Sequence, residues 1–207
     1  MIAYNSLSEA LSYDAIASRG FGKRLLLIDG IRTLVVYDDE LYLGTTRPLF
    51  GGVSFQNRLG WTLLRIPLYP MLGAQVWKYT STSEQLTRVV GGIGRQPDHN
   101  GFGDRQNFEI WAMEEYNGLL FAGTMYPLPT YVSFRRNQLL DWSVLVTKQQ
   151  DPGQLWVFDG NSWVCVTSDG FGDEYNVGFR NMIVYNDALF VGTMNIHTGS
   201  QIWKVTL

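Results

Sequence analysis

The side chains of this 207-residue chain that could carry out catalysis are one glutamate and two arginines in related positions. Glu109 could act in acid–base chemistry, but catalysis by paired carboxylates needs a separation of about 5–9.5 Å, which a sequence does not give. Arg32 and Arg180 each stand twelve residues before the glycine of a Gly-Thr pair, and Trp111 takes the same place between them. Two such arginines either bind a carboxylate or phosphate or pair with neighbouring acids. The sequence predicts no catalytic residues. If the protein is an enzyme, Glu109, Arg32 and Arg180 are the candidates.

A pair of loops offers oxygen atoms that could bind a metal ion. The motif Gly-Phe-Gly-Asp-x-x-Asn places Asp104 with Asn107 and, later in the chain, Asp173 with Asn176. Ca²⁺ takes about 6–8 oxygen ligands, and each loop supplies only two such side chains. Aspartate and asparagine also cap their own turns by bonding to nearby backbone groups. The motif therefore predicts turn capping. These four residues are the candidates for a metal site, and no cofactor is predicted.

Binding chemistry is concentrated in two inserted segments, 47–72 and 126–152. Each combines aromatic residues with arginine, and binding hot spots are built from such residues. Each insert is predicted to form an extra hairpin, with a short helix across 54–60 as the alternative in the first. The predicted ligand-binding residues are Phe55, Arg58, Trp61, Tyr126, Tyr131, Phe134, Arg135 and Trp142. The alternative is that these hairpins pack on each other or form a contact between subunits.

The elements that position these residues come from an internal repeat. Segments 34–46, 113–125 and 182–194 each read as a strand, a two-residue turn and a second strand that ends in Gly-Thr. The turns are Asp-Asp, Asn-Gly and Asn-Asp, dipeptides that tolerate positive φ in a tight hairpin. The repeat therefore predicts three β-hairpins of one kind.

Further strands complete each repeated unit. A third strand carries a tryptophan in the same register, at Trp77, Trp156 and Trp203. A fourth follows the second copy at 162–168 and the first at 85–90. Four short antiparallel strands per unit are typical of a β-propeller blade. The sequence predicts an all-β protein of three such blades.

The unit boundaries predict how a ring would close. The units span about 20–100, 101–169 and 170–207, and the last has no fourth strand of its own. Residues 12–18 have the spacing of that missing strand. Propellers typically have about 4–8 blades, so three are too few. We expect a six-bladed homodimer in which each 12–18 strand completes the last blade of the other copy; the alternative is a fragment of a longer propeller.

The units resemble a propeller repeat of bacterial and archaeal proteins. The best copy combines Gly-Phe-Gly-Asp-Glu-Tyr-Asn at 170–176 with the segments 184–193 and 194–204, the latter containing Thr-Gly-Ser-Gln-Ile-Trp. The turn at 159–163 is similar to a degenerate Asp-box of sialidase-type propellers. In the first unit Lys23 and Ile28 depart from the pattern. The resemblance implies the fold and leaves the function open, because propellers serve as lectins, scaffolds and enzymes.

Composition limits the remaining functions. The net charge of −3 gives no electrostatic reason to expect nucleic acid or an anionic membrane as a partner. No signal peptide or transmembrane segment is recognisable, so a cytoplasmic location is expected. We expect a non-enzymatic binding propeller that engages a protein or glycan through a rim formed by the inserts. The alternatives are a glycan hydrolase or lyase with its site at the channel mouth, and a structural subunit of a larger assembly.

Overall fold

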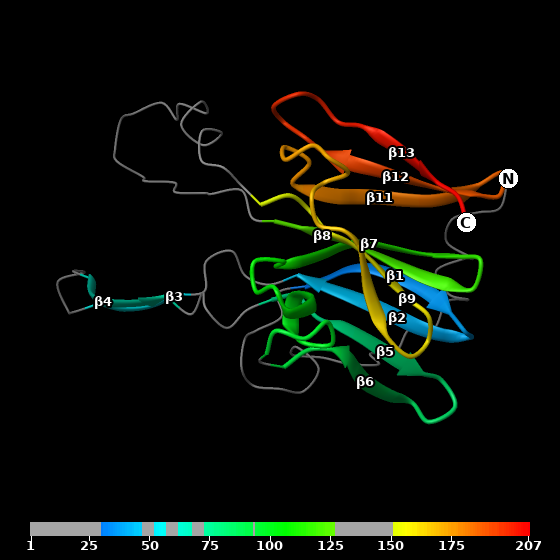
Figure 1. The fold of residues 1–207 in the computed structure, drawn as a ribbon. Coiled ribbons are helices and arrows are strands. Elements are labelled where there is room, and N and C mark those ends of the chain that lie inside the picture. Colours follow the sequence, from blue (N-terminus) through cyan, green and yellow to red (C-terminus); the bar gives the residue numbers. More distant parts are fainter. Residues whose placement is uncertain (1–29, 47–51, 57–61, 68–72, 93, 127–150) are drawn as a thin grey trace, which may run out of the picture.

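The computed structural model describes residues 30–46, 52–56, 62–67, 73–92, 94–126 and 151–207 (Figure 1). These residues form antiparallel β-strands and contain no α-helix. The all-β prediction is therefore confirmed. Among the described residues, no helix has the length and apolar character needed to cross a membrane.

The strands run as three consecutive antiparallel meanders. The first meander consists of β1 (Gly30–Tyr37), β2 (Glu40–Thr46), β5 (Val76–Thr80) and β6 (Gln85–Val90). The second consists of β7 (Glu109–Tyr116), β8 (Leu119–Met125), β9 (Leu155–Phe158) and β10 (Trp163–Thr167). The third consists of β11 (Gly178–Tyr185), β12 (Ala188–Met194) and β13 (Ile202–Val205). In Figure 1 they form successive layers, from the first meander (blue to teal) at the bottom to the third (orange to red) at the top.

The first two strands of each meander are joined by the predicted two-residue turn. Asn117 and Gly118 have φ of 53° and 74°, and Asn186 and Asp187 have 46° and 55°. The Asp-Asp turn of the first meander has the same left-handed backbone, at 50° and 56°. Short Asn and Asp side chains tolerate this conformation, which matches the twist of a tight hairpin. The turn chemistry predicted from the sequence is confirmed.

Adjacent meanders contact each other mainly through their faces. Backbone pairing between them is limited to one residue pair at each junction, Thr46 with Glu109 and Met125 with Gly178. Strand β7 packs between β1 and β11, so the three first strands are neighbours. We call the contact of the first and second meanders the first junction, and that of the second and third the second junction.

The hydrophobic core lies in these two junctions. At the first junction Ile110, Leu120 and Val76 are fully buried, and Trp156 stacks on Phe102 with ring centroids 4.8 Å apart. At the second junction the fully buried side chains are Leu155, Phe179, Leu189 and Val191. Each meander thus buries its apolar residues against the next one, and the outward faces of the first and third meanders lie beyond both cores.

Two further elements bear on the sequence predictions. Within the first insert, β3 (Gly52–Gln56) and β4 (Thr62–Pro67) pair antiparallel with each other. A 3-10 turn, η2 (Asn100–Gly103), contains Gly101 and Phe102 at φ of 64° and 58°. The matching loop has Gly170 and Phe171 at 66° and 61°, so the repeated Gly-Phe-Gly motif forms the same left-handed turn twice. Residues 12–18 and most of the second insert lie outside the described ranges.

Candidate functional site

A β-bulge stands at the same place in the first strand of every meander. The register against the second strand shifts between Ile31 and Thr33, between Ile110 and Ala112, and between Phe179 and Asn181. The residues at these shifts are Arg32, Trp111 and Arg180. Because a bulge changes the direction of a side chain relative to the sheet, the repeated irregularity sets these three residues apart from their neighbours.

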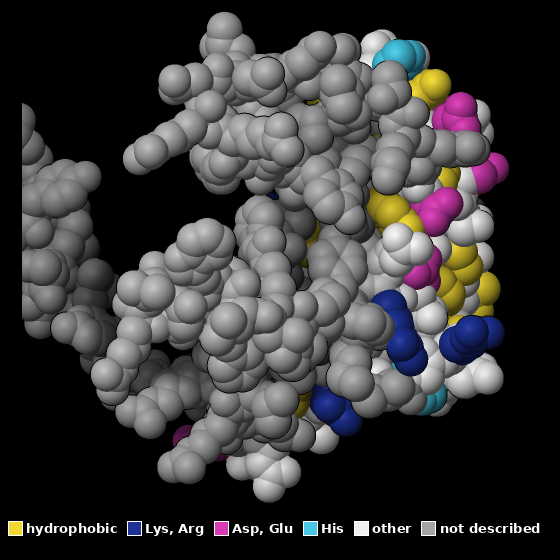
Figure 2. All heavy atoms as spheres, turned by 90° about the vertical axis from the view of Figure 1, so that its left-hand side faces the viewer, with side chains coloured by type: hydrophobic (Ala, Val, Ile, Leu, Met, Phe, Trp, Pro, Cys, Tyr) yellow, Lys and Arg dark blue, Asp and Glu magenta, His cyan; other side chains and the backbone are white. Residues whose placement is uncertain are grey.

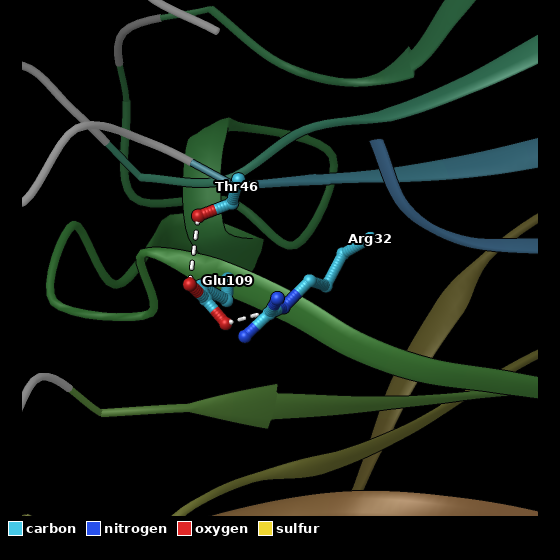
Figure 3. Close-up of polar contacts among 3 residues, drawn as sticks. All are labelled: Arg32, Thr46 and Glu109. Atoms are coloured by element: carbon cyan, nitrogen blue, oxygen red, sulfur yellow. Dashed lines mark hydrogen bonds and ion pairs between the residues drawn. The ribbon is translucent and has the colours of Figure 1, made fainter. Parts of the chain in front are cut away.

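Arg32 and Glu109, which the sequence offered separately, form an ion pair. The Arg32 Nε atom donates to Glu109 Oε2 at 3.0 Å, and the Thr46 hydroxyl donates to Oε1 at 2.8 Å (Figure 3). The Glu109 side chain is 9% exposed, whereas that of Arg32 is 44% exposed. Both carboxylate oxygens therefore accept a hydrogen bond from the first meander. The arrangement ties the start of β7 to β1 and β2.

Trp111 is contacted by both arginines. The guanidinium carbon of Arg32 lies 5.9 Å from the indole centroid, and that of Arg180 lies 5.4 Å from it. A guanidinium at this distance from an aromatic ring is attracted by the ring's quadrupole. Arg32 also has Glu109, whereas Arg180 forms no ion pair with any described residue. The chemistry that these groups support together is the binding of an anion.

The first Gly-Phe-Gly-Asp loop uses its asparagine to fix its own backbone. The Asn107 amide is fully buried and donates to the Gly101 carbonyl at 2.9 Å and to Gln154 Oε1 at 2.7 Å. Its oxygen accepts the Thr124 hydroxyl at 2.8 Å. These bonds join the loop to β8 and to the start of β9, so the Asn107 oxygen and amide are both engaged within the protein.

The second loop repeats this arrangement with more donors. Asn176 donates to the Gly170 carbonyl and to Gln201 Oε1, both at 2.8 Å. Asp173 Oδ2 accepts from Asn195, Thr198 and Gln201 at 2.9–3.1 Å, and its Oδ1 accepts the Tyr175 N–H at 3.0 Å. No three His, Cys, Asp or Glu side chains in the described ranges are grouped so that they could hold a metal ion. The contacts agree with the predicted turn capping at Asp104, Asn107, Asp173 and Asn176.

The two aspartates of these loops have pKa values that shift in opposite directions. Burial raises the pKa of Asp104, which accepts from the Gln106 N–H at 2.9 Å and from Gln154 at 3.4 Å. The Tyr175 N–H is the main cause that lowers the pKa of Asp173, and side-chain donors add to it. The charged form is thus favoured at Asp173, where four donors converge, and disfavoured at Asp104.

The third meander should lose stability in acid through Asp173. Its folded-state pKa is below the ordinary value of 3.8, so its stabilising contribution is present above pH 3.8 and is lost as the pH falls through the folded value. We expect the midpoint of thermal unfolding to fall more steeply between about pH 5 and about pH 2 in the unaltered chain than in Asp173→Asn. Circular dichroism at a series of pH values measures this. Asp104→Asn is the matched control. It should lose stability in acid as the unaltered chain does, because burial raises the pKa of Asp104. Equal dependence of the unfolding midpoint on pH in Asp173→Asn and the unaltered chain would contradict a stabilising role for the Asp173 carboxylate.

Two of the predicted ligand-binding residues, Phe55 and Tyr126, fall within the described ranges. Arg58, Trp61, Tyr131, Phe134, Arg135 and Trp142 lie outside the described ranges, and Phe55 falls in β3. Tyr126 is described: it is 7% exposed, and its hydroxyl donates to Asp151 at 2.7 Å. The predicted binding rim therefore stays a prediction.

Sequence reasoning missed a glutamine that supports each tryptophan. The indole N–H groups of Trp77, Trp156 and Trp203 donate to the side-chain oxygens of Gln75, Gln154 and Gln201 at 3.0–3.1 Å. The same glutamine oxygens accept the loop asparagines in the second and third meanders. The repeated Gln-x-Trp spacing was a visible signal for this connection between the loop and the third strand.

Neither surface charge nor similarity assigns a function to the site. On the right-hand side of Figure 2, acidic side chains of the described residues lie in the upper half and basic ones lie below them, with apolar side chains between. Compared with known protein families the chain matches none, and no curated protein sequence matches it.

Proposed function

We propose that the chain is one half of a six-bladed β-propeller, that two copies close the ring, and that the closed ring is a non-enzymatic binding module. Each meander is one blade in this proposal. The observation that carries it is a set of contacts between neighbouring meanders that occurs at both junctions inside the chain. The residues that would form the same contacts once more are exposed, some on the outer face of the first meander and the others on the outer face of the third.

A glycine contact is the first member of this set. A methyl group built on Gly44 would lie 2.8 Å from Cγ2 of Ile110, and one built on Gly123 would lie 2.6 Å from Cβ of Phe179. At the equivalent glycine of the third meander, Gly192, the nearest described residue to an added methyl group is Asn181, at 3.8 Å. The residue equivalent to Ile110 and Phe179 in the first meander is Ile31, which is 49% exposed, whereas the other two are fully buried. Gly192 and Ile31 are therefore the two halves of a third contact of the same kind.

A tyrosine hydrogen bond is the second member. The Tyr37 hydroxyl donates to the Gly118 carbonyl at 3.2 Å, and the Tyr116 hydroxyl donates to the Asp187 carbonyl at 2.6 Å. Each bond runs from the end of a first strand to the turn of the following meander. Tyr185, in the same position of the third meander, is 63% exposed, compared with 6% and 3% for Tyr37 and Tyr116. By the same rule its acceptor is the carbonyl of Asp39 in the turn of the first meander of a second copy.

The outer faces also expose apolar side chains that the junctions bury. Ile202 is 81% exposed, whereas its equivalents Val76 and Leu155 are fully buried. Leu34 is 57% exposed, whereas its equivalent Met113 is 4% exposed. Burying a large aliphatic side chain is worth about 1.5–3 kcal/mol, so covering these two faces supplies a driving force for association.

Two copies satisfy these contacts with a closed ring. In the proposed dimer, the outer face of the third meander of one copy packs on the outer face of the first meander of the other. A two-fold axis forms this contact twice. Six blades lie within the usual range of about 4–8 for propellers, whereas three do not. The third meander ends at β13, which is the edge of its sheet, and residues 12–18 of the second copy are proposed to add the fourth strand.

The ligand is proposed to be a protein or a glycan bound at the rim that carries the inserts. The contacts of Glu109 favour a binding role over catalysis, because both of its oxygens accept hydrogen bonds from Arg32 and Thr46. An enzyme that relied on Glu109 as a base would have to break this arrangement first.

A disulfide between the two faces tests the ring. A methyl group built on Gly44 lies 2.9 Å from Cβ of Ile110, and a disulfide needs a Cβ–Cβ distance of about 3.5–4.5 Å, so a small adjustment suffices. We expect Ile31→Cys with Gly192→Cys to form a covalent pair of chains on oxidation. The only native cysteine, Cys165, is exposed and is replaced by serine in every variant.

Non-reducing gel electrophoresis separates the outcomes. A closed ring gives one band at twice the chain mass, and neither single-cysteine variant gives it. A ladder of larger species would indicate an open, repeating assembly. Absence of any cross-linked band would contradict the contact between the two faces.

A further inference from the structure

We propose that Arg180 anchors a carboxylate group of a ligand beside Trp111, at the place in the ring where the three bulges lie. This inference rests on the proposed ring, because a second copy forms the other side of the site.

At the first junction the bulge residue meets a carboxylate. Arg32 binds Glu109, the first residue of β7, and the Thr46 hydroxyl completes the carboxylate's contacts. The pair shows that a carboxylate fits against a bulge arginine within this fold. It leaves the charge of Arg32 balanced by a group of the protein itself.

At the second junction the corresponding pair is apolar. Gly178 occupies the position of Glu109, and a methyl group built on it would lie 2.8 Å from Cε3 of Trp111. The indole thus covers the glycine, and no charge is present in either residue. The two junctions follow one rule. The bulge residue of a meander lies against the residue that begins the first strand of the next meander.

The same rule places Arg180 opposite Gly30 of a second copy. Gly30 has no side chain, and a methyl group built on it would lie 3.4 Å from Cγ2 of Thr46, the one close neighbour among the described residues. Arg180 is exposed, and its guanidinium carbon lies 5.4 Å from the centroid of the Trp111 indole. We call the proposed contact of the third meander with the first meander of a second copy the third junction. Among the described residues, it has the arginine of the first junction and a glycine, Gly30, at the position of Glu109, which leaves room for a carboxylate.

The chemistry of these groups defines the ligand class. A guanidinium presents a planar fork of donors that matches a carboxylate with two parallel hydrogen bonds. The neighbouring indole adds a flat apolar surface for the part of the ligand that follows the carboxylate. Because Glu109 occupies the equivalent place at the first junction, we assign a carboxylate in preference to a phosphate. A two-fold ring contains two such anchors.

The test measures binding of citrate, a small carboxylate probe, to the full chain at low ionic strength. Citrate should bind saturably in isothermal titration calorimetry, and Arg180→Gln should weaken it by about tenfold or more, because a hydrogen bond between charged groups is lost. Arg180→Lys keeps the charge without the fork and should fall between the two. Arg88→Gln, an exposed arginine of β6, is the matched control and should bind like the unaltered chain.

Light scattering on the same samples separates this inference from the ring. A dimer that does not bind citrate, or whose Arg180→Gln and Arg88→Gln variants bind alike, overturns the anchor while the ring stands. Inorganic phosphate that binds tighter than citrate overturns the assignment to a carboxylate. A single chain that binds citrate through Arg180 supports Arg180 as the anchor, and contradicts both the ring and the part of the site assigned to the second copy.

Discussion

Gly192→Leu should convert the protein from a pair of chains to a single folded chain. Within one chain, the nearest described residue to the added Cβ is Asn181, at 3.8 Å. In the proposed ring the new side chain collides with Ile31 of the second copy, as a side chain on Gly123 would collide with Phe179. Overpacking costs about 1–3 kcal/mol and the ring contains the junction twice, so dimerisation should weaken about 30-fold or more. Light scattering after size exclusion gives the mass, and circular dichroism shows whether the β-structure is retained.

Gly123→Leu is the matched control, because it places the same side chain at the equivalent position inside the chain. A methyl group at Gly123 already lies 2.6 Å from Cβ of Phe179 and 2.7 Å from Cε of Met182. This variant should therefore lose stability in the chain itself, with a lowered midpoint of unfolding. If both glycine variants unfold the chain alike, or if Gly192→Leu keeps the mass of the unaltered protein, Gly192 does not face a second copy.

Phe179→Ala should cost about 3–5 kcal/mol of folding free energy. Phe179 is fully buried at the second junction, where it packs edge-on against Phe171 at 5.0 Å between centroids. Its removal leaves a cavity between the second and third meanders that their strands fill only in part. Urea denaturation of the Gly192→Leu background measures the effect without a contribution from dimerisation.

Ile31→Ala in the same background is the comparison that makes the prediction specific. Ile31 occupies the equivalent strand position but is 49% exposed in the single chain. Its truncation there should change the folding free energy by about 0.5 kcal/mol or less. In the unaltered background it should weaken dimerisation. Equal losses for Phe179→Ala and Ile31→Ala in the single chain would contradict the assignment of Ile31 to an outer face.

The local structure of the repeats could be predicted because local chemistry determines it. Asn117-Gly118 and Asn186-Asp187 adopt the left-handed turn that their residue types favour. The Asp and Asn side chains of the Gly-Phe-Gly-Asp loops bond to their own turns and to nearby strands. Each of these features depends on residues a few positions apart, where spacing in the sequence translates directly into distance.

Contacts between meanders were harder to predict because they depend on how one unit is aligned with the next. The sequence offered Arg32 and Glu109 as separate candidates, 77 positions apart, and their ion pair depends on the stagger of β1 against β7. The tyrosine bonds across the junctions depend on the same stagger. The role of Gln154 was visible in the repeated Gln-x-Trp spacing, but a glutamine's partners can be assigned only when the loop and the third strand are placed together.

The mass of the unaltered chain in solution tests the central claim most directly. Light scattering coupled to size exclusion, on untagged protein, needs no variant and no ligand. The proposed ring predicts twice the chain mass of 23.5 kDa, unchanged over a range of protein concentrations. A monodisperse species of one chain mass would contradict it, since the faces carrying Ile31 and Gly192 would then remain uncovered in the native protein.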